Sequence, residues 1–179
     1  EKDSDIIEEV KLCDSKGVGI TGGDPLLKID RTVDYIKLLK KEFGKEFHIH
    51  LYTSIDIIDD EKLKRLYEAG LDEIRFHPEI YHGLDKNLEK LDMALKYDWA
   101  VGIEIPVIPD KKQEIIKLIE LIKEKVKFLN LNELEYTEEL TDFGYLCKEY
   151  ESYAIKGSED IAFELLDYLK DKNLNVHYC

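Results

Sequence analysis

Residues 17–26, GVGITGGDPL, join a short apolar run to two glycines, an aspartate and a proline. Asp24 can cap the turn that follows the run, and Pro25 suits the first position of a helix. Without Cβ atoms at Gly22 and Gly23, a ligand can approach the main chain. The stretch therefore predicts either a plain strand-to-helix turn or a binding site. Main-chain carbonyls and Asp24 favour an ammonium group as its ligand over a phosphate, which would need a basic residue.

Strands and helices alternate outward from this stretch. Apolar runs and period-two alternation predict strands at 18–20, 47–53, 73–77, 100–107, 127–134 and 174–178. Helical spacing predicts helices at 1–13, 30–43, 59–70, 84–98, 110–126 and 158–173, with Gly70 ending the third and Ser158 capping the last. The alternation predicts an α/β fold in one domain, with a parallel sheet curled into an open or partial barrel.

Residues 135–157 form the one long connection in this pattern. At about 23 residues it is too long for a plain loop in a compact domain. We expect it to fold and to cover another part of the molecule.

Composition and charge exclude several classes of protein. The chain is 44% hydrophobic and 37% charged, which is typical of a globular protein, and its net charge of −14 argues against DNA as a partner. It holds no run of about 18 apolar residues that could span a membrane. Cys13, Cys147 and Cys179 match no zinc or disulfide framework. We expect Cys13 in the core and free thiols in a reducing cytoplasm.

Polar residues follow one face of several predicted strands, where a fully covered parallel sheet would be apolar. Such a face is costly inside a barrel unless it is paired or wet, so the pattern favours a hydrated, ligand-filled interior over a self-paired network. Residues at the carboxyl ends of the strands should carry the chemistry. These are Thr21, Tyr52, Thr53, His77, Glu104, Asn130, Asn132 and Glu133.

The run GITGGDPLL (19–27) resembles the glycine-rich motif after the second strand of radical S-adenosylmethionine (radical SAM) enzymes. Other segments follow in the family's order: HIHLYTS (48–54), AGLDEIRFHP (69–78), GIEIPVIP (102–109) and FLNLNELE (128–135). The chain is most similar to archaeal members that resemble the pyruvate formate-lyase activating enzyme. The resemblance implies a partial (β/α)6 TIM-like barrel of parallel strands with outer helices.

The resemblance also implies an activity and its cofactors. In such enzymes a [4Fe–4S] cluster reductively cleaves S-adenosylmethionine to a 5′-deoxyadenosyl radical, which abstracts hydrogen from the substrate. For this chain it implies an oxidoreductase core of the activating-enzyme type in the cytoplasm. It suggests a glycyl-radical protein as partner, although many relatives act on small molecules or RNA. The substrate itself is not implied.

Residues carried over from the family motif are implied to bind the cofactor. The backbone of Gly22, Gly23, Asp24 and Pro25 would bind the methionine amino group, and Tyr52, Thr53 and Ser54 would lie near the methionine or ribose. Glu104 would accept hydrogen bonds from ribose hydroxyls, or alternatively pair with Arg75. Asn130 and Asn132 would face adenine, ribose or substrate.

The chain departs from the family in one respect. The family's CxxxCxxC motif, which holds the cluster, is absent, and the three cysteines cannot replace it. The chain also does not begin with methionine. We therefore expect a fragment that lacks an N-terminal strand and the cluster loop, holds no metal ligands of its own and is inactive by itself.

Two alternative functions compete with this interpretation. His48 and His50 on one strand face, with His77 and His177 on other strands, resemble the ligand set of metal-dependent hydrolases built on (β/α) barrels. The second alternative is a cluster-less, non-catalytic module that binds a partner through its acidic surface.

Overall fold

The computed structural model describes residues 3–78, 88–149 and 152–179. Two compact units divide the chain: Glu1–His77 with Asn87–Val101, and Pro78–Lys86 with Gly102–Cys179. The six strands follow the order β1-β2-β3-β4-β5-β6 in the sheet. The pairs β1/β2, β2/β3, β4/β5 and β5/β6 are parallel. The predicted α/β fold with a parallel sheet is thereby confirmed.

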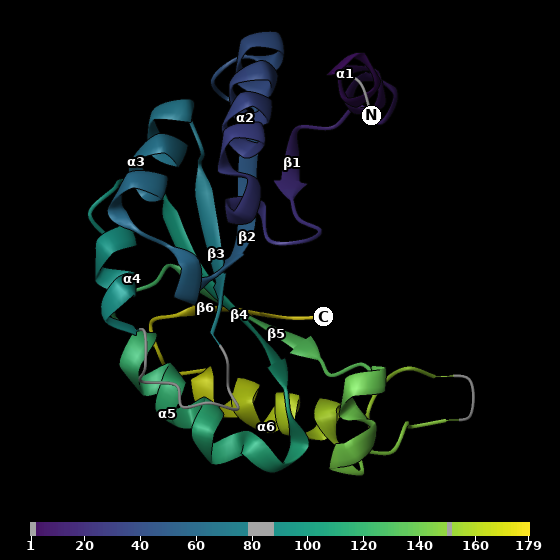
Figure 1. The fold of residues 1–179 in the computed structure, drawn as a ribbon. Coiled ribbons are helices and arrows are strands. Elements are labelled where there is room, and N and C mark those ends of the chain that lie inside the picture. Colours follow the sequence, from purple (N-terminus) through teal and green to yellow (C-terminus); the bar gives the residue numbers. More distant parts are fainter. Residues whose placement is uncertain (1–2, 79–87, 150–151) are drawn as a thin grey trace. The chain divides into compact units, whose positions relative to one another are not determined.

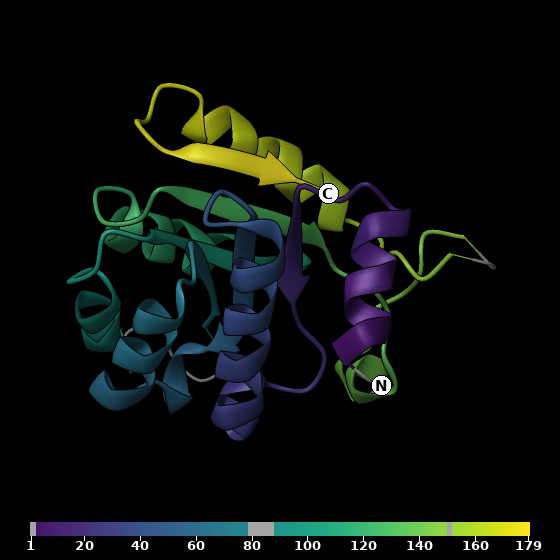
Figure 2. The ribbon, with the colours of Figure 1, turned by 90° about the horizontal axis from the view of Figure 1, so that it is seen from above.

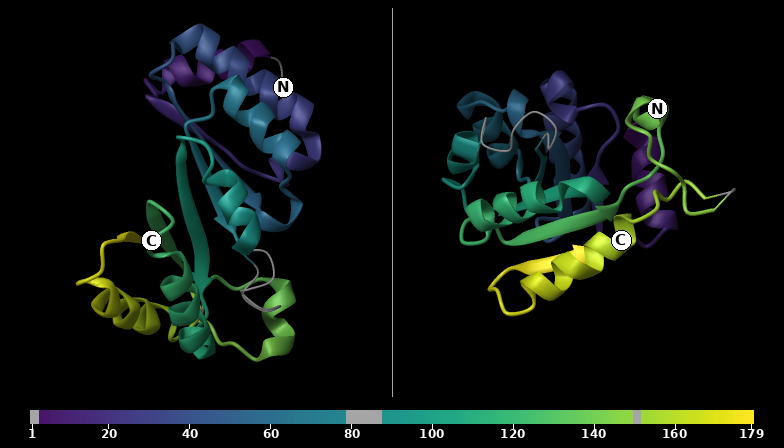
Figure 3. Two further views of the ribbon diagram at one scale, coloured as in Figure 1. Left: turned by 90° about the vertical axis from the view of Figure 1, so that its left-hand side faces the viewer. Right: turned by 90° about the horizontal axis from the view of Figure 1, so that it is seen from below.

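The first unit alternates helices and strands from the N-terminus onward (Figure 1). Its elements are α1 (Asp3–Leu12), β1 (Gly17–Ile20), η1 (Pro25–Lys28), α2 (Ile29–Phe43), β2 (His48–Ser54), η2 (Ile55–Ile57), α3 (Asp60–Ala69), β3 (Glu73–His77) and α4 (Leu88–Ala94). Helices α2 and α3 lie side by side in the left view of Figure 3.

Alternate residues of β2 and β3 build the core of this unit. Ile49 and Leu51 on β2, and Ile74 and Phe76 on β3, are fully buried. The intervening residues of both strands are less buried, so each strand has one apolar and one polar face, as the period-two pattern predicts.

The second unit contains the remaining elements. They are β4 (Ala100–Val107), which begins at the end of the first unit, η3 (Pro109–Lys111), α5 (Lys112–Ile122), β5 (Phe128–Glu133), η4 (Glu138–Phe143), α6 (Ser158–Leu169) and β6 (Asn175–Tyr178). Figure 2 shows α6 alongside β6. Helices α5 and α6 are joined by a hydrogen bond from Tyr168 Oη to Glu120 at 2.5 Å and by an ion pair between Lys112 and Glu164.

Most helix boundaries agree with the sequence patterns. Asp59 caps α3 by accepting from the Lys62 amide, and Gly70 ends the helix in the left-handed conformation. The predicted helices 84–98, 110–126 and 158–173 are too long, because α4, α5 and α6 end at Ala94, Ile122 and Leu169. Residues 84–87 of the first of these lie outside the described residues.

Two predicted roles of single residues are wrong. Gly157, not Ser158, is the N-cap of α6. Ser158 is fully buried, donates its Oγ hydrogen to the Val107 carbonyl at 2.7 Å and accepts from the Leu134 amide at 2.8 Å. Cys13 is exposed rather than buried, because α1 ends at Leu12 and turns only Val10 into the core.

The 135–157 connection is folded, as predicted. Its two arms meet in antiparallel bridges between Glu135 and Ala154 and between Cys147 and Ile155. Helix η4 lies between the arms. Ile155 is fully buried, whereas Phe143 is more than half exposed. That the connection covers another part of the protein stays a prediction.

Among the described residues, no helix has both the length and the apolar character that a membrane span needs.

Candidate cofactor site

The glycine-rich turn after β1 is held by the side chain of Asp24. Its carboxylate accepts hydrogen bonds from the Leu26 amide at 2.9 Å, the Ser54 amide at 2.8 Å and the Thr53 hydroxyl at 2.8 Å. Asp24 therefore caps η1, as predicted, and also fastens the turn to the carboxyl end of β2. The carboxylate therefore acts as a brace that accepts hydrogen bonds from three donors of the protein itself. We accordingly look to the main chain of the turn for contacts with a ligand.

The main chain of this turn is open on the side that a side chain would occupy. Gly22 has a φ of +109°, a conformation that favours glycine. Among the described residues, no atom lies within 4 Å of an ideal Cβ at Gly22 or Gly23. Gly23 has no positive φ, so neither strain nor packing by the described residues calls for glycine there. That a ligand approaches the main chain here stays a prediction.

A cavity of about 670 Å³ is lined by residues of α1, β1, η1 and α2 and by Gly23 and Asp24 of the turn itself. Val18 and Ile20 line it, so it lies on the helix-covered face of β1. The opposite face of β1 carries Gly19, which lies against the His50 ring. Because Gly23 itself lines the cavity, the open turn forms part of the cavity wall.

The predicted cofactor residues of β2 divide between its two faces. Thr53 is buried and donates to Asp24, so its hydroxyl supports the turn from the apolar face. Tyr52 lies on the polar face, where its hydroxyl accepts from Arg75 at 2.7 Å and its ring stacks on His77 at 5.8 Å between centroids. Contact between these residues and a cofactor stays a prediction.

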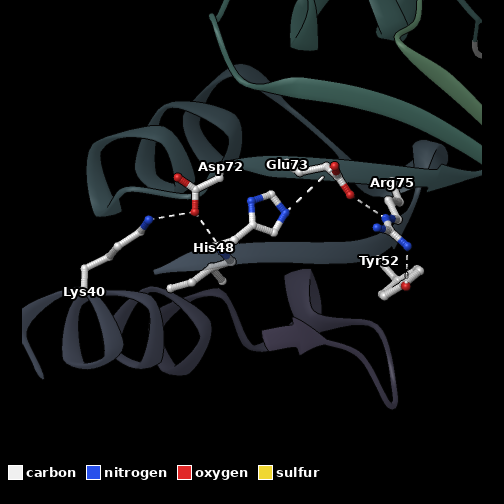
Figure 4. A network of polar contacts seen from close by, with 7 residues as sticks. Lys40, His48, Tyr52, Asp72, Glu73 and Arg75 are labelled. Atoms are coloured by element: carbon white, nitrogen blue, oxygen red, sulfur yellow. Dashed lines mark hydrogen bonds and ion pairs between the residues drawn. The ribbon is translucent and has the colours of Figure 1, made fainter. Parts of the chain in front are cut away.

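A chain of polar contacts joins the polar faces of β2 and β3 (Figure 4). Arg75 Nε donates to Glu73 Oε1 at 2.6 Å, and Glu73 Oε2 lies 3.9 Å from His48 Nε2. At the amino end of the strands, Asp72 Oδ2 accepts from Lys40 Nζ and from the Ile49 amide, each at 2.7 Å. The polar face is therefore an ordered network rather than loose surface charge.

The three predicted cofactor residues of the second unit lie together. Glu104 Oε2 accepts from Asn130 Nδ2 at 3.0 Å, and Glu104 Oε1 accepts from Asn132 Nδ2 at 3.1 Å. All three are partly buried, and a carboxylate oxygen has two acceptor positions, so each oxygen of Glu104 retains one for a ligand hydroxyl. The alternative pairing of Glu104 with Arg75 joins residues of the two units and stays a hypothesis.

Lys148 was not anticipated from the sequence as part of a site. It forms ion pairs with Glu133, at the carboxyl end of β5, and with Glu159 at 3.0 Å. Hydrogen bonds that Lys148 Nζ donates to these two carboxylates raise the pKa of Lys148 well above its usual value. The lysine thereby anchors the 135–157 connection to the end of a strand.

The structure thus gathers the predicted site residues into two groups. Gly22, Gly23, Asp24, Pro25, Thr53 and Ser54 meet at one turn in the first unit, with Tyr52 on the neighbouring polar face. Glu104, Asn130 and Asn132 meet in the second unit. The Asp24–Thr53 contact and the Arg75–Tyr52 contact were not predicted as pairs, although strand pairing between Tyr52 and Arg75 could have suggested the latter.

The cysteines do not fit a [4Fe–4S] cluster. Cys13 lies just after α1 in the first unit, whereas Cys147 and Cys179 belong to the second. Cys147 sits in a β-bridge with Ile155, and Cys179 Sγ donates to the Asn132 side-chain carbonyl at 3.3 Å. A cluster needs several thiolates converging on one point, and the one group of three potential metal ligands found among the described residues contains no cysteine.

The fold is that of an α/β protein with a parallel sheet and a glycine-rich turn after its first strand. The model of the Radical SAM superfamily matches residues 2–122, so the chain belongs to this family. The family uses S-adenosylmethionine and a [4Fe–4S] cluster.

A relative with a curated name points to one type of enzyme within this family. The chain is 50% identical over 184 residues to a protein of Methanocaldococcus jannaschii that is provisionally named a glycyl-radical enzyme activating enzyme. This match covers 97% of the chain and 48% of the relative, so the chain spans about half the length of the protein that it resembles. The comparison favours neither the hydrolase nor the non-catalytic alternative.

Solved structures agree on the fold. SuiB from Streptococcus suis, bound to its precursor peptide SuiA, matches all of the chain and 42% of its own length, with a TM-score of 0.68 and 16% identity. Coproporphyrinogen III oxidase (HemN) from Escherichia coli, a radical SAM enzyme, matches 87% of the chain and 40% of its own length, with a TM-score of 0.58 and 15% identity. The expected partial TIM-like barrel class is thereby confirmed.

Proposed function

We propose that this chain is the S-adenosylmethionine-binding core of a radical SAM enzyme of the activating-enzyme type. The family match over residues 2–122 and the 50% identity to a provisionally named activating enzyme support the class. The observation that carries the proposal for the site is the open main chain at Gly22 and Gly23.

The proposed role of the turn is to hold the amino-acid end of the cofactor. Exposed carbonyl groups at Gly22 and Gly23 accept hydrogen bonds from the methionine ammonium group. Asp24 contributes through its brace, because its three bonds fix the direction of those carbonyls before the ligand arrives. In this arrangement the cofactor reaches the main-chain carbonyls without displacing any side chain of the turn.

The second group serves the ribose in this proposal. A carboxylate accepts two hydrogen bonds from neighbouring hydroxyls, and Asn130 and Asn132 hold the carboxylate of Glu104 in place. Asn130 and Asn132 are proposed to face the adenine, ribose or substrate.

The cluster requires ligands that this chain does not supply, so we propose that they belong to a part of the protein outside these 179 residues. When bound, the cluster supplies the electron that cleaves the cofactor to the 5′-deoxyadenosyl radical. The name of the archaeal relative favours a glycyl-radical protein as the substrate. We further propose a cytoplasmic location, since three free cysteines suit a reducing compartment.

The test uses the complete protein, with iron and sulfide supplied anaerobically. With a strong reductant and S-adenosylmethionine, it should form 5′-deoxyadenosine, measured by chromatography. Addition of a glycyl-radical protein should give a glycyl radical signal in electron paramagnetic resonance. Binding of S-adenosylmethionine without any 5′-deoxyadenosine would overturn the proposed activity, and 5′-deoxyadenosine without a glycyl radical would overturn the proposed partner.

A further inference from the structure

A group of three metal-ligating side chains lies on the polar face of the first unit, apart from the proposed cofactor turn. His48 and His50 of β2 and Glu73 of β3 each offer one ligand atom, and these atoms lie within 4.8 Å of one another. Parallel pairing places His50 directly opposite Glu73. Imidazole nitrogen and carboxylate oxygen are ligands that zinc and related transition metals bind.

The spacing of the ligand atoms is close to that of a metal centre. His48 Nε2 and Glu73 Oε2 are 3.9 Å apart. Ligand atoms at about 2.1 Å from a tetrahedral zinc ion lie about 3.4 Å from each other. His48 is the most exposed of the set, with 48% of its side chain accessible, so its ring has room for the small rotation that would close the group around an ion. The same exposure gives an ion access from solvent.

Neighbouring residues hold the other two ligands in position. Arg75 binds Glu73 Oε1 at 2.6 Å, which turns Oε2 toward His48 (Figure 4). Gly19 of β1 leaves room for the His50 ring, because a Cβ at this position would lie 2.6 Å from His50 Nε2. Residues that orient ligands in this way are the usual support of a metal site.

The number of carboxylates and imidazoles in the group indicates which kind of metal ion it would bind. Glu73 is the only carboxylate among the three, and it shares its charge with Arg75. Asp72 is engaged by Lys40 and by the Ile49 amide. Calcium and magnesium need more oxygen ligands than this. Two imidazoles instead favour a divalent transition metal.

We propose that His48, His50 and Glu73 form a binding site for a divalent transition metal such as Zn²⁺, which links β2 to β3. The site is distinct from the proposed cofactor turn, since His48 begins β2 whereas the turn is fastened to Ser54 at the strand's other end. It goes beyond the proposed radical chemistry and does not depend on it.

The test is a calorimetric titration of the chain with Zn²⁺. Cys13, Cys147 and Cys179 are replaced by serine so that thiols cannot bind the ion. We expect one equivalent to bind and the thermal unfolding temperature to rise. His50→Ala and Glu73→Gln should each lower the affinity by about tenfold or more, since even the loss of a group that only orients a ligand costs about 10–100-fold.

His77→Ala is the matched control, because it removes an exposed imidazole at the other end of β3. It should change the affinity by less than about twofold. His48→Ala is a second test variant. It should lower the Zn²⁺ affinity while leaving the fold intact, because this side chain is half exposed. Failure to bind one equivalent of Zn²⁺, or equal losses for His77→Ala and His48→Ala at unchanged metal-free unfolding temperatures, would overturn the proposal.

Discussion

Gly19 and Gly23 lie four residues apart in one stretch of sequence, yet the structure uses them in opposite ways. A Cβ at Gly19 would lie 2.6 Å from His50 Nε2, so glycine is needed there because the protein itself fills the space. A Cβ at Gly23 would meet no described atom within 4 Å. The packed surroundings of Gly19 give it a structural role, whereas the open space beside Gly23 leaves room for the ligand that we propose there.

This difference separates the two polar features of the first unit. His50, which lies beside Gly19, contacts His48, and His48 in turn belongs to a network of side chains between β2 and β3. The turn at Gly23 offers only main chain, because the one charged side chain of the turn, Asp24, is bonded to Leu26, Thr53 and Ser54. The following substitutions are expected to break or sharpen this comparison.

Asp24→Ala should have the largest effect, because it removes the brace that keeps the turn at Gly23 open. The Thr53 hydroxyl and two amides lose their acceptor, and Thr53 is buried. We expect a loss of about 2–4 kcal/mol in the free energy of unfolding, measured in urea. Asp30→Ala, which removes an exposed carboxylate of α2, is the control and should cost less than about 1 kcal/mol. Equal losses for both variants would contradict the brace.

Gly19→Ala should destabilise the protein by about 1–3 kcal/mol, since the new methyl group must displace the His50 ring. Gly23→Ala is the matched variant, and it should change the free energy of unfolding by less than about 0.5 kcal/mol. Both are measured by urea denaturation. The comparison fails if the two variants lose stability to the same extent.

Glu104→Gln extends the comparison to the second unit. A glutamine cannot accept from both Asn130 and Asn132 and also present a charged acceptor to a ribose hydroxyl. We expect the affinity for S-adenosylmethionine to fall by about tenfold, which corresponds to the loss of one charge-assisted hydrogen bond. If stability falls while the affinity stays constant, Glu104 is only a structural partner of the asparagines.

Lys148→Met should have the smallest effect. The ion pairs with Glu133 and Glu159 are partly exposed and screened by solvent, so their loss should lower the free energy of unfolding only slightly. Because the carboxylates raise the pKa of Lys148, these pairs should persist at low salt until the pH exceeds the ordinary range for lysine. Limited proteolysis should show faster cleavage within 135–157, and an unchanged rate would exclude Lys148 as its anchor.

The order of the strands and helices could be predicted from the sequence alone, because the spacing of apolar residues is a local property of each element. β3 and β4 have the boundaries that alternation predicts, and the end of α3 at Gly70 was visible in the residues. Helix ends without such signals, at Ala94, Ile122 and Leu169, were predicted too far along the chain.

Roles that depend on tertiary contacts could not be predicted. Ser158 looked like a cap because it precedes two acids, but its hydroxyl bonds to Val107 and Leu134, which lie far away in sequence. Gly19 and Gly23 look alike in the sequence, since only the position of the His50 ring tells them apart. The cofactor residues gather as groups, but whether they touch a cofactor depends on a ligand that no pattern of residues encodes.

The most direct test of the account is a titration of Gly23→Val with S-adenosylmethionine, in the complete protein with its cluster reconstituted. A branched side chain at this position should block the main chain from the ligand while leaving thermal unfolding unchanged, because no described atom occupies the space. We predict a loss of affinity of about 100-fold or more. Wild-type affinity in a folded Gly23→Val protein would contradict the claim that the open turn is the cofactor contact.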